Sequence, residues 1–143
     1  MAKGDDGQMR NVYPISPVAK PRMTRRDKWA KRTCVLKYRA FKDEVRLRKI
    51  TLPPAGAHVT FVVPMPASWS KNRRAAMLGK PHKQRPDVDN FGKALLDAIY
   101  EDDSGVYDIR LSKVWGDTGG IVIQVQQADS GFSLIDASNS AAN

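Results

Sequence analysis

Cysteine, acidic residues and long apolar runs are all scarce in this sequence. Among its 143 residues Cys34 is the one cysteine, so no disulfide can form within the chain and a reducing compartment is expected. No stretch approaches the roughly 18 apolar residues that a membrane span requires. The N-terminus also lacks the apolar segment of a secretory signal. We therefore expect a cytoplasmic protein that does not cross a membrane.

The shortage of acidic residues bears on the partner. The chain has 24 Lys and Arg against 15 Asp and Glu, which gives a formal net charge of +9. Clustered cations gain free energy by releasing the counterions condensed on phosphates, so a polyanion such as nucleic acid is a candidate partner. Net charge alone does not establish this binding, because many soluble proteins carry excess lysine.

Length and composition fit one folded domain. Hydrophobic residues make up 41% of the chain and charged residues 27%, enough for a single core with a soluble surface. Both ends are small, polar and aperiodic. Residues 1–11 and 128–143 are therefore predicted to be flexible, and residues 12–127 to fold.

Both strands and helices are predicted within this domain. An alternating segment with two prolines indicates an edge strand and a turn in residues 11–20. Helical periodicity covers residues 24–50 and 90–100, and a shorter helix lies between Ser68 as N-cap and Gly79 as terminator. Further strands are predicted in residues 58–66, 106–115 and 120–126, the last two joined as a hairpin by the glycines of residues 116–120.

Six of the 15 acidic residues fall in residues 86–103, which read PDVDNFGKALLDAIYEDD. Asp87 follows a proline and precedes the first helical turn, so its extended backbone can aim its side chain toward the same place as Asp89. Two such carboxylates form half a site for a hard divalent cation. One face of the helix is apolar and consists of Phe91, Ala94, Leu95 and Ala98. The opposite face is polar and consists of Asp89, Lys93 and Asp97.

The same residues also have structural explanations. Aspartate at a helix start caps backbone N–H groups, and residues 101–105, EDDSG, suit an exposed turn. Lys93 either pairs with Asp89 on the helix surface or stabilises charge on a reacting phosphate. An EF-hand calcium loop is excluded, because Phe91 and Ala98 occupy its fifth and twelfth ligand positions. If the strand of residues 106–115 packs beside the helix, Asp103 returns toward Asp87 and completes a three-carboxylate metal site.

The string HKQRPDVDNFGKALLDAIYEDDSGVYDIRLSKVW, with MPASWSKNRR and TRRDKWAKR before it, resembles the RusA family of Holliday-junction resolvases. The resemblance spans most of the folded region. It implies a small α+β domain with a mixed or antiparallel sheet, flanking helices and a homodimeric assembly. It also implies an enzyme of bacteria and their prophages that uses Mg2+, with Mn2+ as a substitute, to cut four-way DNA junctions by paired incisions in recombination and repair.

The resemblance carries residue roles with it. The metal-binding aspartates of the motif fall on Asp87, Asp89 and Asp103, and its essential lysine falls on Lys93; Asp102 is the alternative third ligand. Two sets of cations flank predicted loops and are candidates for DNA contacts, with a solvated surface as the alternative. They are Lys20, Arg22, Arg25 and Arg26, then Lys71, Arg73, Arg74, Lys83 and Arg85.

Two other functions fit the same sequence. A DNA-binding module without catalytic activity would use the acids only to cap a helix. A nuclease that acts on flaps, forks or RNA would use the same metal site, and no residue excludes it.

Overall fold

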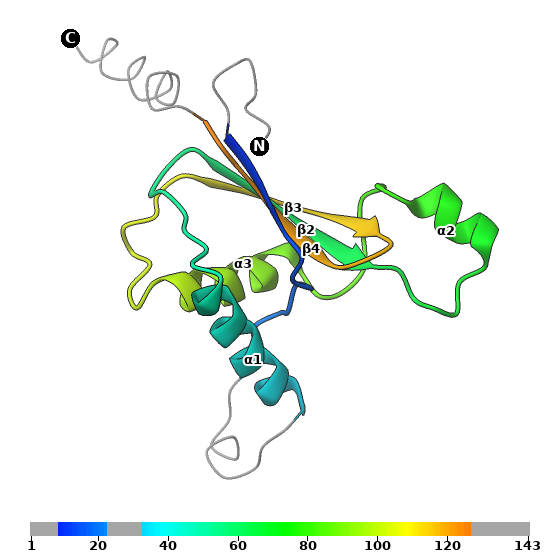
Figure 1. Ribbon diagram of the computed structural model, residues 1–143, viewed down its shortest axis with the longest axis horizontal. Coiled ribbons are helices and arrows are strands. Elements are labelled where there is room, and N and C mark those ends of the chain that lie inside the picture. Colours follow the sequence, from blue (N-terminus) through cyan, green and yellow to red (C-terminus); the bar gives the residue numbers. More distant parts are fainter. Residues whose placement is uncertain (1–8, 23–32, 127–143) are drawn as a thin grey trace.

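Four strands form one mixed sheet in the order β1–β4–β2–β3. The computed structural model describes residues 9–22 and 33–126 (Figure 1). Helices α1 and α3 lie on one side of the sheet, and α2 projects beyond the end where β2 and β3 finish. This is the predicted α+β class. The elements are β1 (Met9–Tyr13), α1 (Thr33–Leu47), β2 (Ala57–Pro64), α2 (Lys71–Met77), α3 (Val88–Ile99), β3 (Ile109–Gly116) and β4 (Gly120–Val125).

The predicted hairpin between the last two strands is wrong. β3 pairs in parallel with β2, whereas β4 lies on the other side of β2 and runs antiparallel to both β2 and β1. The short connection between β3 and β4 therefore crosses the end of β2. A Cβ on Gly116 would lie 2.3 Å from Val62 Cγ1, so glycine here permits this close crossing. A short glycine-containing connection does join the two strands as predicted, but β4 pairs with β2 and β1 instead of with β3.

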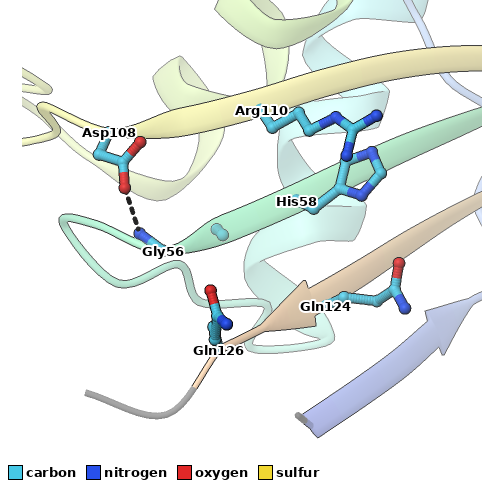
Figure 2. A pocket seen from close by; sticks show the side chains of 7 residues that line it. Gly56, His58, Asp108, Arg110, Gln124 and Gln126 are labelled. Atoms are coloured by element: carbon cyan, nitrogen blue, oxygen red, sulfur yellow. Dashed lines mark hydrogen bonds between the residues drawn. The ribbon is translucent and has the colours of Figure 1, made fainter. Parts of the chain in front are cut away.

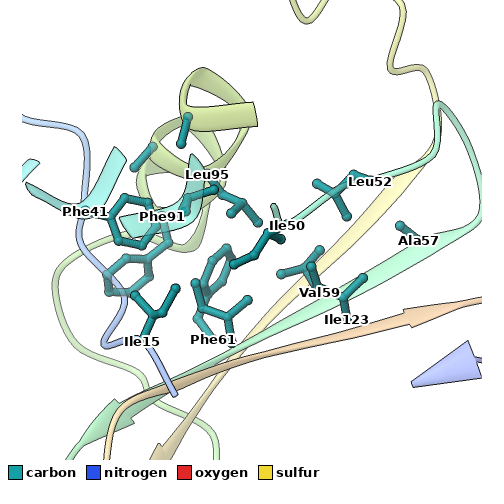
Figure 3. Packing of buried hydrophobic residues seen from close by; sticks show 14 of the residues in the cluster. Ile15, Phe41, Ile50, Leu52, Ala57, Val59, Phe61, Phe91, Leu95 and Ile123 are labelled. Atoms are coloured by element: carbon teal, nitrogen blue, oxygen red, sulfur yellow. The ribbon is translucent and has the colours of Figure 1, made fainter. Parts of the chain in front are cut away.

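The core fills the space between the sheet and helices α1 and α3 (Figure 3). Phe61 of β2 is fully buried, and its ring lies 5.4 Å from that of Phe91 on α3. A Cβ on Gly92 would approach Leu111 Cδ1 within 2.6 Å, so this glycine lets α3 lie close against β3. The predicted apolar face of α3 is confirmed, since its four members are all buried: Phe91, Ala94, Leu95 and Ala98.

The long N-terminal helix is confirmed over Thr33–Leu47, and the rest of its predicted start lies outside the described residues. Its end is a Schellman-type turn, in which Lys49 has a left-handed φ of 55° and the Ile50 N–H donates to the Val45 carbonyl at 3.2 Å. Val45 and Ile50 are both buried, so the turn also joins the core.

Several boundaries differ from those predicted, by up to about three residues at most strand and helix ends. β1 begins at Met9, inside the segment predicted to be flexible. The remainder of both predicted tails, residues 1–8 and 128–143, lies outside the described part, as does residue 127, which was predicted to belong to the folded domain. α2 is capped by Ser70 rather than Ser68, because the helix begins only at Lys71 and the Ser70 hydroxyl accepts from the Arg73 N–H at 3.1 Å. Within residues 9–22 and 33–126 no helix has the length and apolar character needed to cross a bilayer.

We predict that Gly119→Ala destabilises the fold. A Cβ at this position would lie 2.6 Å from the Ser16 Cα, a backbone atom that cannot rotate away. Overpacking of this kind costs about 1–3 kcal/mol in free energy of unfolding, measurable by urea denaturation. Gly105→Ala is the matched control, since nothing lies within 4 Å of a Cβ there. Equal urea midpoints for the two variants would contradict the contact.

Candidate active site

Asp87 is the N-cap residue of α3, but its carboxylate does not cap the helix. Its backbone is extended, with φ −67° and ψ 149°, and its side chain makes no capping hydrogen bond. Instead, the backbone carbonyl of Asp87 accepts from the Asn90 N–H at 3.1 Å. The side chain is exposed and has no bond to another described residue. The capping explanation therefore does not account for this carboxylate.

Asp89 and Lys93 lie one turn apart on the exposed side of α3. Their Oδ2 and Nζ atoms are 3.6 Å apart, and both side chains are about 60% exposed (63% and 60%). An exposed i,i+4 pair contributes only a few tenths of a kcal/mol, so each group is free to exchange this partner for another ligand. The structure thus holds Asp87, Asp89 and Lys93 within two turns of one helix.

A cationic hollow of about 400 Å3 adjoins Lys93. The segment that follows β1 supplies Lys20, Pro21 and Arg22 to it, and α3 supplies Asn90 and Lys93. The Lys20 N–H donates to the Asn90 carbonyl at 3.1 Å, which fixes this segment against the helix. Two members of the first predicted DNA-binding set therefore meet the predicted catalytic lysine; Arg25 and Arg26 lie outside the described residues.

Asp97 serves the fold. Its Oδ2 atom accepts from the Tyr38 hydroxyl at 2.7 Å and pairs with Lys20 Nζ at 2.6 Å. Burial alone would raise the pKa of Asp97, but these two hydrogen bonds and the charges of Lys20 and Lys42 lower it below its ordinary value. Burial and the Asp97 carboxylate raise the pKa of Tyr38. This acid joins α1 to α3 and is not available for a ligand.

Asp103 lies at the opposite end of α3 from Asp87. Residues 100–108 leave the C-terminal end of the helix and contact the segment before β2, where the Tyr107 N–H donates to the Pro54 carbonyl at 3.0 Å. A helix of 12 residues is about 18 Å long, so one chain does not bring the three aspartates together. Among the described residues no group of three or more His, Cys, Asp or Glu side chains could hold a metal.

The two acids of this turn differ. Asp102 Oδ1 accepts from the Ser104 N–H at 3.0 Å, and this bond lowers the pKa of the Asp102 carboxyl. The exposed Asp103 carboxylate has no bond to another described residue. Asp103 is therefore the freer of the two alternative ligands.

Lys113 positions the loop before Asp87, and it is not among the predicted site residues. It occupies a core-facing position of β3, yet its Nζ atom donates to the carbonyl of Pro86 at 2.7 Å and to that of Gln84. These bonds hold the loop immediately before Asp87 against the sheet. In the sequence, Lys113 interrupts the alternating apolar series of Ile109, Leu111 and Trp115. A half-buried ammonium group needs hydrogen-bond acceptors, so this interruption was the available sign of a positioning role.

The second predicted DNA-binding set divides into structural and exposed members. Arg74 donates to the Pro66 carbonyl at 3.0 Å and lies 3.6 Å from Asp117, so it helps to shape the loop between β2 and α2. Arg73 stacks over the Trp69 ring, 3.9 Å from its centroid. The other three are exposed and make no bond through their side chains to described residues: Lys71, Lys83 and Arg85.

A polar hollow of about 430 Å3 lies on the sheet face opposite the helices (Figure 2). His58, Arg110 and Gln124 project into it from three strands. Burial and the neighbouring Arg110 lower the pKa of His58, whose Nε2 lies 2.9 Å from Ser112 Oγ. None of the predicted catalytic residues lines this hollow, so it is separate from the candidate active site.

The fold and the site together define a basic α+β domain with exposed carboxylates at one helix start and a cationic hollow beside them. Residues 14–126 match the model of the family described as Endodeoxyribonuclease RusA. The chain belongs to this endodeoxyribonuclease family.

The match to one curated relative is partial. "Uncharacterized protein YqaN" of Bacillus subtilis (strain 168) is 29% identical over 93 residues, which cover 59% of this chain and 66% of that protein. The chain thus spans just under two thirds of the length of YqaN.

We predict that Asp97→Asn lowers the free energy of unfolding by about 1–3 kcal/mol at pH 7, because its charged hydrogen bonds are lost. The lowered pKa means that wild-type Asp97 stabilises the fold above the ordinary carboxyl pKa. This contribution is lost as the pH falls through the folded value. Urea denaturation from pH 7 to pH 3 should show the two proteins converging in acid. A constant difference at every pH would contradict this role, and Asp43→Asn on α1 is the control.

Proposed function

We propose that this protein is a divalent-metal-dependent endodeoxyribonuclease that resolves four-way DNA junctions in cytoplasmic recombination and repair. The observation that carries the proposal is the exposed Asp87 carboxylate, which starts α3 without capping it, two residues before exposed Asp89. Membership of the RusA endodeoxyribonuclease family supports DNA as the substrate. The net charge of +9 supports attraction of a polyanion.

Asp87 and Asp89 would hold Mg2+, with Mn2+ as a substitute, because both ions prefer carboxylate oxygen ligands. When bound, such an ion supplies an activated water and neutralises charge on the scissile phosphate. Lys93 would turn from Asp89 toward that phosphate and stabilise the charge that develops on its oxygens. The adjoining hollow, with Lys20 and Arg22, would receive the neighbouring phosphate of the same strand.

A homodimer would account for both the substrate and the third carboxylate. A four-way junction has approximate twofold symmetry, so a dimer with twofold symmetry presents equivalent sites to two strands. Asp103 lies about one helix length from Asp87 in its own chain. We propose that Asp103 of a second copy approaches the Asp87 and Asp89 carboxylates.

The first test is cleavage of a labelled four-way junction. Wild-type protein should make paired nicks with Mg2+ or Mn2+ and none with EDTA, as seen on denaturing gels. Asp87→Asn and Asp89→Asn should each reduce cleavage by more than about 100-fold, since even outer-shell changes at metal sites cost 10–100-fold. Junction binding should persist, because the cations that attract DNA are intact. Asp43→Asn on α1 is the matched control and should cleave normally.

Other outcomes of this assay would overturn the proposal. Binding without cleavage in Mg2+ would indicate a DNA-binding module without catalytic activity. Equal cleavage of flaps, forks, linear duplex or an RNA hairpin would contradict selectivity for junctions. Full activity in both aspartate variants would contradict the proposed metal site.

The shared site predicts complementation between two inactive variants. Asp87→Asn and Asp103→Asn proteins should each be inactive as homodimers. In a mixed dimer, one site would combine both substitutions and the other would be intact. An equal mixture, refolded together, should therefore recover about a quarter of the wild-type sites and nick one strand per dimer. No recovery would place all the ligands of each site in one chain, and an active Asp103→Asn homodimer would favour Asp102.

A further inference from the structure

A second hollow near the candidate active site lies between α2 and the segment that leads to α3. Its volume is about 410 Å3. Ala76 and Met77 of α2 and Trp115 of β3 form much of its apolar wall, and the segment after α2 adds Lys80, Pro81 and Lys83. None of the lining residues is acidic. None of the residues assigned above to the metal site lines it.

The aromatic wall of this hollow is held rigidly. Trp115 is only 5% exposed, and its ring lies 4.1 Å from that of His82 and 4.8 Å from that of Trp69, measured between centroids. His82 is itself only 4% exposed. Backbone pairing adds to this support, since the Trp115 N–H donates to the Lys80 carbonyl at 3.0 Å. The hollow therefore exists before any ligand arrives, which lowers the cost of binding.

The chemistry of the lining fits one nucleotide. A nucleobase is flat and apolar on its faces and packs against aromatic and apolar side chains. Lys80 and Lys83 are exposed, so both can pair with the phosphates on either side of that base. Lys83 also lies four residues before Asp87 in the chain, so a nucleotide held here is close along the DNA to the proposed site of cleavage.

We propose that this hollow binds an unstacked nucleobase of branched DNA. The proposal rests on the proposed function in that its ligand is DNA. It goes further by assigning a site that distinguishes a branch point from continuous duplex. A base in continuous duplex must break its stacking and pairing before it can enter such a hollow, whereas a base at a branch point has less to break.

The test uses two leucine substitutions on adjacent residues of α2. Ala76 lines the hollow, whereas Ala75 is exposed on the same helix and does not line it. Affinity for a four-way junction and for linear duplex of equal length is measured by fluorescence anisotropy in EDTA, so that cleavage plays no part. Ala76→Leu should weaken junction binding by about tenfold, within the range that base stacking provides, and leave duplex binding unchanged. Ala75→Leu should change neither.

A second pair of variants removes apolar wall instead of filling the hollow. Met77→Ala should weaken junction binding selectively, whereas Leu78→Ala, next to it and 51% exposed, should not. Unchanged junction affinity in Ala76→Leu and Met77→Ala would overturn the proposal. So would an equal loss for junction and duplex, or a wild type that binds both equally. Selective loss in EDTA would support the hollow even if wild-type protein failed to cleave in Mg2+, so failure of the nuclease proposal is a separate result.

Discussion

Lys113 makes the contacts on which the start of α3 depends. Its neighbours on the same face of β3 are apolar and face the core, so its ammonium group reaches the site from the inside of the domain. There it donates to the carbonyls of Gln84 and Pro86, two groups that no helix or strand ladder satisfies. Asp87 follows directly, and its backbone carbonyl accepts the first bond of α3. One half-buried cation thereby connects the sheet to the position of a candidate metal ligand.

The parallel pairing of β2 and β3 gives the domain its two functional ends. Parallel neighbours need a long crossover, and here that crossover contains both α2 and α3. The chain therefore enters α3 at the end of the sheet where β2 and β3 finish, beside α2, and leaves it at the end where they begin. Asp87, Lys113 and the hollow beside Trp115 share the first end. Asp103 belongs to the second end, which is why its proposed role requires another copy of the chain.

Local patterns were enough to predict most elements but not their partners. The 3.6-residue period identified the buried face of α3, and Gly79 after α2 has the left-handed φ of 76° expected of a helix terminator. In contrast, the glycines between β3 and β4 carry the same signal whether the next strand pairs with β3 or crosses to β2. Packing across the sheet determines which strand β4 pairs with, and the residues of the turn do not encode that packing.

The candidate site divides in the same way. Spacing on one helix was sufficient to place Asp87, Asp89 and Lys93 near each other, since these distances are set by helix geometry. The contacts of Lys20 with Asn90 and Asp97 join residues about seventy positions apart, and no sequence pattern encodes such a distance. Asp97 illustrates this limit. In the sequence it lies on the same polar face of α3 as Asp89, but in the structure its carboxylate is bound by Tyr38 and Lys20.

The distribution of charge explains why the protein can leave two carboxylates exposed beside a surface that attracts phosphates. Lys20 pairs with Asp97 at 2.6 Å, but Asp87 has no ion pair with a described residue and Asp89 has only the loose pair with Lys93. A DNA phosphate that approached these two carboxylates unaided would be repelled. The surrounding lysines and arginines would hold the DNA backbone nearby, and a divalent ion between carboxylate and phosphate would convert that repulsion into attraction. In this arrangement, the basic surface provides affinity, whereas the acidic helix start provides the dependence on metal.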